Sequence, residues 1–173
     1  MSAIQIHGLV ILVLSCASCV RDTNLPTRDL DRSIQTDQLA YDLIGSDDRK
    51  SVALGFSFTN HSDYVIDAFL GCNNEIHAKL EVQRSGEWIT AWRSSDHGCP
   101  NFLHMNPGET VVDTITVFAL RSGIPRFEVD SIDGVYRMVW VGPVTYRRAA
   151  GSDLVDSLPT ASRTSNRFLL RVK

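Results

Sequence analysis

The chain is 173 residues long, enough for one domain with tails, and its 43% hydrophobic and 21% charged residues are typical of a globular protein rather than a disordered one. Its formal net charge of −3 is too small to indicate a polyanionic partner. No stretch interleaves basic with aromatic residues, so we do not expect the protein to bind nucleic acid.

The first feature along the chain is an uninterrupted apolar run over residues 9–14. It is much shorter than the roughly 20 residues needed to cross a bilayer. It does suit the apolar region of an export signal, although the preceding MSAIQIHG lacks the usual Lys or Arg. We therefore predict a signal peptide over residues 1–15 and an exported protein.

Two cysteines follow this run in LVLSCASC. The segment resembles the box of bacterial lipoprotein signals, in which an aliphatic residue and two smaller residues precede the modified cysteine. VLSC fits this box with Cys16 as the modified residue, apart from the bulky Leu14, whereas CASC ends at Cys19 and puts Cys16 where an aliphatic residue belongs. We predict lipidation at Cys16, with Cys19 or an ordinary secretory signal as alternatives. The membrane is then a partner through a lipid anchor, in the periplasm or at the cell surface.

Residues 16–36 are mostly polar and charged and are predicted to be a tether, followed by a folded domain over residues 37–173. From residue 52 onward apolar and polar side chains alternate, as in half-buried strands. Residues 35–44 are ambiguous, and 147–166 is predicted to be a long loop. Strands are predicted at 52–59, 64–70, 76–83, 88–92, 110–120, 134–141 and 167–173.

Turn-forming residues separate these strands. NHSD occupies residues 60–63, RSGE at 84–87 is predicted to close a hairpin, and MNPGET at 105–110 offers Gly108 for a left-handed turn position. No segment shows a convincing run of helical periodicity. We therefore predict an all-β fold, an Ig-like antiparallel β-sandwich of about seven strands.

Cys72 and Cys99 belong to the folded domain, and in an exported chain such a pair is most simply a disulfide. The alternative is a metal or nucleophile site built on Asp96, His97 and Cys99 in DHGC. Zinc takes four protein ligands, or three with water, and a cysteine nucleophile needs a base held by a third group. The remaining histidines show no ligand spacing relative to this group: His61, His77 and His104. We predict no metal, no cofactor and no enzymatic activity.

Four segments, LGFSFTNHSD, GEWITAW, MNPGET and GVYRMVW, together resemble the Ig-like domains of the bacterial intracellular proteinase-inhibitor type. The resemblance spans roughly residues 52–141 and rests on turn and packing signatures, so it implies a fold more than an activity. It implies that Tyr136, in a late Gly-x-Tyr, forms a tyrosine corner. The cysteine pair and the export signal depart from the family, and no inhibitory residue is carried over.

The sequence leaves three functions open. The first is a non-catalytic binding or structural module of the cell envelope, whose unknown protein or peptide partner contacts the loops at 94–104 and 121–133 or a sheet edge. The second is an inhibitor of extracytoplasmic proteases that uses the 94–104 loop. The third is a metal-binding or enzymatic site at His97 and Cys99. The candidate binding-loop residues are Ser95, Asp96, His97 and Phe102.

The three tryptophans are expected to pack in the core or on a sheet face, with a stacking platform for sugars or peptides as the alternative. They are Trp88, Trp92 and Trp140.

Overall fold

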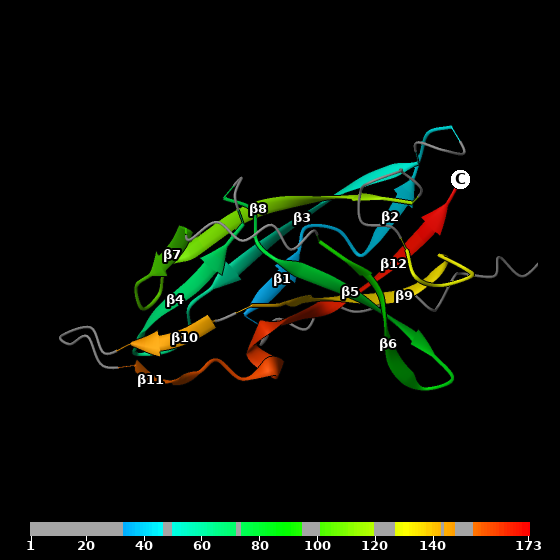
Figure 1. The fold of residues 1–173 in the computed structure, drawn as a ribbon. Helices are drawn as coiled ribbons and strands as arrows, with labels where there is room; N and C mark the ends of the chain where they lie inside the picture. Colours follow the sequence, from blue (N-terminus) through cyan, green and yellow to red (C-terminus); the bar gives the residue numbers. More distant parts are fainter. Residues whose placement is uncertain are drawn as a thin grey trace, which may run out of the picture.

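The computed structural model describes residues 33–46, 50–71, 74–94, 101–119, 127–142, 144–147 and 154–173. Within these ranges the chain forms twelve β-strands and one short 3₁₀ helix, η1 (Thr160–Arg163), as Figure 1 shows. No helix in the described ranges is long and apolar enough to cross a membrane. The strands are β1 (Ile34–Thr36), β2 (Ala40–Leu43), β3 (Ser51–Thr59), β4 (Val65–Leu70), β5 (Ala78–Arg84), β6 (Glu87–Arg93), β7 (Asn101–Met105), β8 (Thr110–Phe118), β9 (Gly134–Trp140), β10 (Val144–Arg147), β11 (Leu154–Ser157) and β12 (Thr164–Val172).

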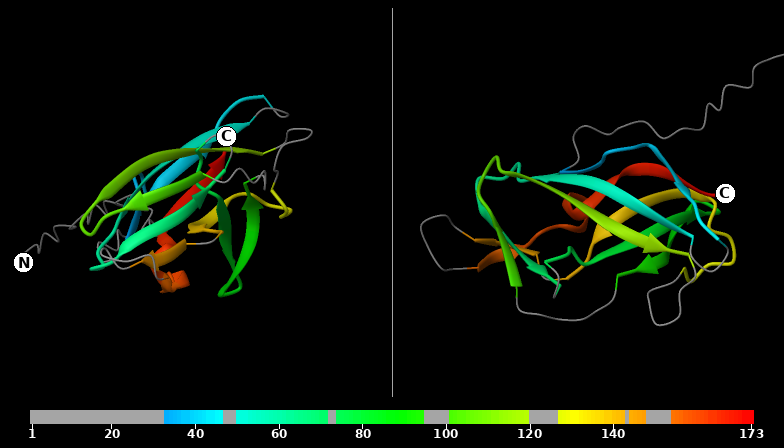
Figure 2. Two further views of the ribbon diagram at one scale, coloured as in Figure 1. Left: turned by 60° about the vertical axis from the view of Figure 1, so that its left-hand side comes forward. Right: turned by 90° about the horizontal axis from the view of Figure 1, so that it is seen from above.

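The strands form two sheets that lie in two layers (Figures 1 and 2). The larger sheet has eight strands in the order β6-β5-β9-β12-β1-β3-β8, and β2 also pairs with β12. The smaller sheet has four strands in the order β11-β10-β4-β7. The predicted all-β sandwich is therefore confirmed. The predicted count of about seven strands is too low, because the additional strands are only three to five residues long and too short to show alternation.

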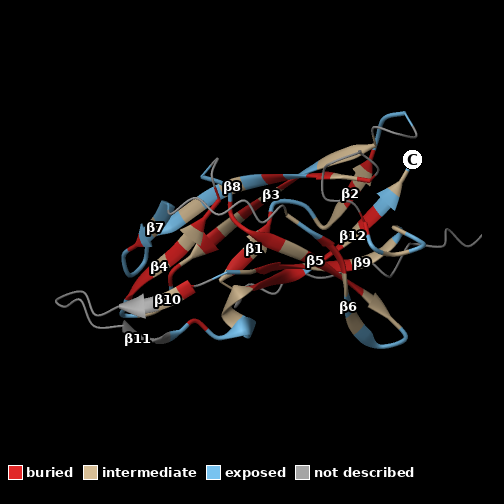
Figure 3. Cartoon of the chain, viewed as in Figure 1, coloured by how far each residue is buried: buried red, intermediate tan, exposed pale blue. Residues whose placement is uncertain are grey.

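The core lies between the two sheets, and Figure 3 shows the buried residues following the strands. Every second side chain of β3 and β5 points into it, as the alternation predicts. From the larger sheet these are Leu54, Phe56, Phe58, Ala78, Leu80 and Val82, each no more than 1% exposed. The smaller sheet closes the core with Ile66, Ala68, Met105 and Val144.

Two short consecutive strands at the N-terminal end of the domain, β1 and β2, join the larger sheet. β1 pairs in parallel with β12 and antiparallel with β3, and β2 then pairs in parallel with β12 further along. The ambiguous residues 35–44 therefore contribute strands, and the sheet is not purely antiparallel. The sheet begins at Ile34, which is fully buried, so the end of the predicted tether at residue 36 is wrong. The signal peptide and the tether before residue 33 lie outside the described residues.

The predicted loop over residues 147–166 is wrong in its second half. This segment contains β11, η1 and the first residues of β12, which starts at Thr164 rather than at residue 167. The pairing of β12 with β9 shifts register between Thr164 and Arg167. Buried polar side chains in this part of β12 form hydrogen bonds to β9 on one side and to β1 on the other. The Ser165 hydroxyl accepts from the backbone N–H of Met138 (2.8 Å), and the Asn166 side-chain oxygen accepts from the N–H of Thr36 (2.7 Å). The alternating pattern fails here because polar residues take buried positions.

The predicted turns and the tyrosine corner are present. Residues 85 and 86 close the β5–β6 hairpin with positive φ, and Gly108 has a φ of 77° in the turn before β8. The Tyr136 hydroxyl donates to the backbone oxygen of Ile132 (2.6 Å), just before β9. This bond ties the entry of β9 to the buried ring, as the resemblance implies.

The three tryptophans pack as expected. Trp92 and Trp140 are buried in the core. Trp88 lies half-buried on the outer face of the larger sheet, where the guanidinium groups of Arg137 and Arg167 lie 4.4 and 5.6 Å from its ring centre.

Candidate functional site

The outer face of the smaller sheet carries an exposed group of aromatic and charged side chains. β4 and β7 pair antiparallel, which sets Asp67 opposite His104 and Phe69 opposite Phe102. Because side chains alternate along a strand, these four residues share the face opposite to the buried Ile66 and Ala68. We call the four residues Asp67, Phe69, Phe102 and His104 the β4–β7 face.

Phe102 is the exposed aromatic residue of this face. Its side chain is 56% exposed, and its ring meets that of Phe69 edge to face, with centroids 5.6 Å apart and planes at 83°. Phe69 in turn contacts the edge of His77, which is buried beside Gly71. The exposed ring is thus held from below by packed side chains, in a geometry that aromatic pairs prefer.

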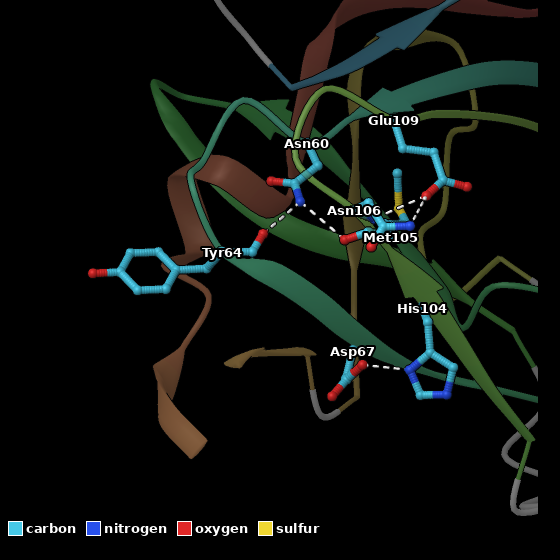
Figure 4. A network of polar contacts seen from close by, with 7 residues as sticks. All are labelled: Asn60, Tyr64, Asp67, His104, Met105, Asn106 and Glu109. Carbon is cyan, nitrogen blue, oxygen red and sulfur yellow. Dashed lines mark hydrogen bonds and ion pairs between the residues drawn. The ribbon is translucent and has the colours of Figure 1, made fainter. Parts of the chain in front are cut away.

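An ion pair lies beside the aromatic pair. The His104 Nδ1 atom lies 2.5 Å from the Asp67 Oδ1 atom, and the two side chains are 62% and 16% exposed (Figure 4). The carboxylate oxygen lies within hydrogen-bond distance of the ring nitrogen and so orients the imidazole. A histidine–carboxylate pair can also serve catalysis, but it then needs a nucleophile within hydrogen-bond reach of the imidazole. Within the described part of the chain, no hydroxyl or thiol is hydrogen-bonded to His104.

The buried Asn60 connects the ends of the strands that carry this face (Figure 4). Its side-chain nitrogen donates to the backbone oxygens of Tyr64 (2.8 Å), just before β4, and Met105 (3.0 Å), at the end of β7. Its side-chain oxygen accepts from the backbone N–H and the hydroxyl of Ser62. The backbone of Asn60 is bonded to the turn before β8, because the N–H of Gly108 donates to the Asn60 backbone oxygen. These hydrogen bonds fix the ends of β4 and β7 relative to each other, and with them the β4–β7 face.

A cleft of about 200 Å³ opens beside the Asn60 turn. Hydroxyl and amide groups mix in its lining with three apolar side chains, so it suits a small group rather than a cofactor. The lining residues are Ser33, Phe58, Asn60, His61, Ser62, Ile66, Leu158 and Ser162.

The structure changes the interpretation of the predicted binding loop. Phe102 lies on β7 and not in a loop, since residues 101–105 pair with β4. The inhibitor hypothesis requires a protruding loop over residues 94–104, but residues 101–104 of that segment belong to β7. The other candidate residues lie outside the described residues: Ser95, Asp96, His97, the cysteines Cys16, Cys19, Cys72 and Cys99, and residues 121–126.

Sequence reasoning missed the pairing of Asp67 with His104. The two residues are 37 positions apart, and only the register of β4 against β7 brings them together. An alternating pattern in 101–105 would have been a signal, but five residues are too few for it. No group of three His, Cys, Asp or Glu side chains that could hold a metal ion occurs among the described residues.

Comparisons with known proteins give little more than a remote likeness. No family model matches the chain, and no curated protein matches it. Among solved structures it is similar to the ASH/PapD-like domain of human CEP192 (PapD-like domain 7), with 14% identity, a TM-score of 0.29, and coverage of 98% of this chain and 94% of that one.

Proposed function

We propose that this protein is an exported, lipid-anchored and non-catalytic β-sandwich module whose β4–β7 face binds a protein or peptide partner. The observation that carries the proposal is Phe102, an aromatic side chain that is 56% exposed yet packed edge-on against Phe69. Aromatic anchors dominate the binding energy of many protein interfaces. A ring already held by its neighbours loses little conformational freedom when a partner covers it.

The surroundings of Phe102 suit a polypeptide ligand. The Asp67–His104 pair supplies a polar rim that can exchange hydrogen bonds with a partner. β7 is also an edge strand: within the described residues it pairs with β4 on one side only. An extended segment could therefore add to β7 through backbone hydrogen bonds while one of its side chains contacts Phe102.

The cellular address is proposed from the sequence. The apolar run at 9–14 and the VLSC segment support export and acylation at Cys16. The same export supports a Cys72–Cys99 disulfide, because bonds of this kind persist outside the reducing cytosol.

Peptide display tests the binding proposal. Random peptides are selected on the immobilised full chain, and their affinities are then measured by fluorescence anisotropy. Phe102→Ala should weaken binding at least about tenfold, the size of effect expected for a central aromatic anchor. The matched control is Ile44→Ala, which also truncates an exposed apolar side chain (64% exposed) but lies next to β2 on the larger sheet. Equal binding by the Phe102→Ala variant, or the absence of any selected peptide, would contradict the proposal.

A further inference from the structure

β8 forms one edge of the larger sheet (Figure 1). Along its backbone, the N–H and C=O groups of alternate residues point toward β3 or away from the sheet. Its nine residues pair with β3 in unbroken register. At one end the N–H of Ala119 donates to the oxygen of Lys50, and at the other the N–H of Asn60 donates to the oxygen of Glu109. Both bonds involve odd-numbered residues of this segment. The backbone N–H and C=O groups of the odd-numbered residues of β8 therefore point toward β3.

The even-numbered residues of β8 therefore direct their N–H and C=O groups away from the sheet. The central ones are Val112, Thr114 and Thr116, with Thr110 at the start of the strand. The close approach of the Thr59 and Thr110 hydroxyls (2.9 Å) agrees with this, because side chains lie nearest in the pairs that exchange no backbone bonds. Within the described residues no strand pairs with this side of β8.

The outward groups are arranged symmetrically about the middle of the strand. Thr114 is the central residue of β8 and belongs to the outward set. Two copies of β8 can thus pair antiparallel about a two-fold axis at Thr114, with Val112, Thr114 and Thr116 of each copy forming about six inter-strand hydrogen bonds. We propose that β8 is a docking edge for a second copy of this chain, in this register.

The side chains of β8 favour a second copy over an unrelated strand. The register sets Val112 opposite Thr116 of the other copy and Thr114 opposite itself, and such β-branched pairs suit a sheet. The one charged residue of the strand, Asp113, falls opposite Ile115 of the other copy and so does not meet its own charge. β8 also contains no Lys and no Pro, two residue types that natural edge strands use to prevent pairing.

Asp113 sets the strength of this contact. Its side-chain oxygen accepts a hydrogen bond from the N–H of Thr114 (2.7 Å), the donor that would lie on the two-fold axis. A second copy must displace this bond before the central pair forms. The carboxylate belongs to the core-facing set between Val111 and Ile115, and such inward-pointing charges are a known protection of sheet edges. We therefore expect a weak, concentration-dependent dimer.

Sedimentation velocity over a range of concentrations tests the proposal. The full chain is used with Cys16 and Cys19 replaced by Ser, so that neither acylation nor these thiols can associate it. The mean sedimentation coefficient should rise with concentration, and Asp113→Val should lower the dimer dissociation constant at least about tenfold. Thr114→Pro in the Asp113→Val background removes the central donor without touching the β3 ladder, and should restore the monomer. Association that survives Thr114→Pro would mean non-specific adhesion and would overturn the proposal.

A second variant tests the register without a proline. Val112→Lys with Thr116→Lys changes two exposed side chains and places lysine opposite lysine in the proposed dimer, so the variant should stay monomeric. Val112→Lys with Thr116→Glu places opposite charges together and should associate at least as tightly as the parent. Equal association of the two variants, or a chain that stays monomeric with and without Asp113→Val, would contradict the proposal.

Discussion

The side-chain nitrogen of Asn60 donates a hydrogen bond to the backbone oxygen of Met105 (3.0 Å), although the two residues are 45 positions apart. This bond joins the turn after β3 to the end of β7, and the same side chain also binds Tyr64 and Ser62. The relative position of β4 and β7 thus depends on the buried side-chain amide of Asn60.

Asn60→Ala should destabilise the fold by about 1–3 kcal/mol, because it removes the hydrogen bonds from a fully buried side chain to the backbone oxygens of Tyr64 and Met105. Urea unfolding followed by tryptophan fluorescence measures the change. Asn106→Ala is the matched control, since Asn106 is exposed and should change the unfolding free energy by no more than about 0.5 kcal/mol. If Asn60→Ala unfolds at the same urea concentration as the control, Asn60 does not fix the relative position of β4 and β7.

Gly55→Ala should also destabilise the protein, by about 1–3 kcal/mol, for a steric reason. A Cβ atom at this position would lie 2.5 Å from the Asp37 Oδ2 atom. Asp37 cannot move without cost, because its carboxylate accepts the Tyr41 hydroxyl. Ser57→Ala on the same strand is the comparison, and thermal unfolding of both variants is the measurement. A Gly55→Ala variant as stable as Ser57→Ala would show that Asp37 relaxes freely.

The two buried tyrosines predict a loss of stability at alkaline pH. Burial raises the pKa of Tyr136, and burial together with the hydrogen bond to Asp37 raises the pKa of Tyr41, both well above the ordinary value near 10. The folded state therefore holds these protons more tightly than the unfolded chain, so this contribution is complete below pH 10 and decreases as the pH rises beyond it. Unfolding free energies measured between pH 8 and pH 11 should fall steeply at the upper end. Tyr136→Phe should be less stable at pH 8 and show a shallower fall, and an unchanged slope would refute the assignment.

Glu81 should make the free energy of unfolding depend on pH in the acid range. Its burial acts to raise its pKa, but hydrogen bonds from Lys79 and Arg137, together with their charges, lower the pKa below the ordinary value. The stabilisation of the fold by Glu81 is present above the pKa of this group in the unfolded chain, near 4.3. It is lost as the pH falls through the lower pKa of the folded state. Glu81→Gln should therefore be less stable at pH 7 by about 1–2 kcal/mol, with the deficit shrinking below pH 4. The exposed Glu87→Gln serves as the control, and a deficit that stays constant with pH would contradict this role.

The sequence predicts the longer strands well because one face of each is buried. β3, β5, β8 and β9 each span seven to nine residues, enough for alternation to be visible. β1, β2 and β7 are shorter, and β12 begins with the buried polar residues Thr164, Ser165 and Asn166, which mimic a loop in composition. Propensity reasoning fails there because tertiary hydrogen bonds make these polar positions favourable.

The candidate site was less predictable than the fold. Phe102 could be selected as a binding residue, but its partner Phe69 and the Asp67–His104 pair arise from the register of two strands that lie far apart in the sequence. A single sequence does not contain that register, since it follows from how both sheets close the core.

The proposed function depends most on the claim that the chain leaves the cytosol and is tied to a membrane. The mass of the mature protein isolated from the membranes of its own cells, measured without reduction, tests it most directly. We expect cleavage before Cys16, a diacylglyceryl group on that residue and a mass two hydrogens lower for a Cys72–Cys99 disulfide. A cytosolic product that keeps residues 1–15 and has four free thiols would contradict the claim.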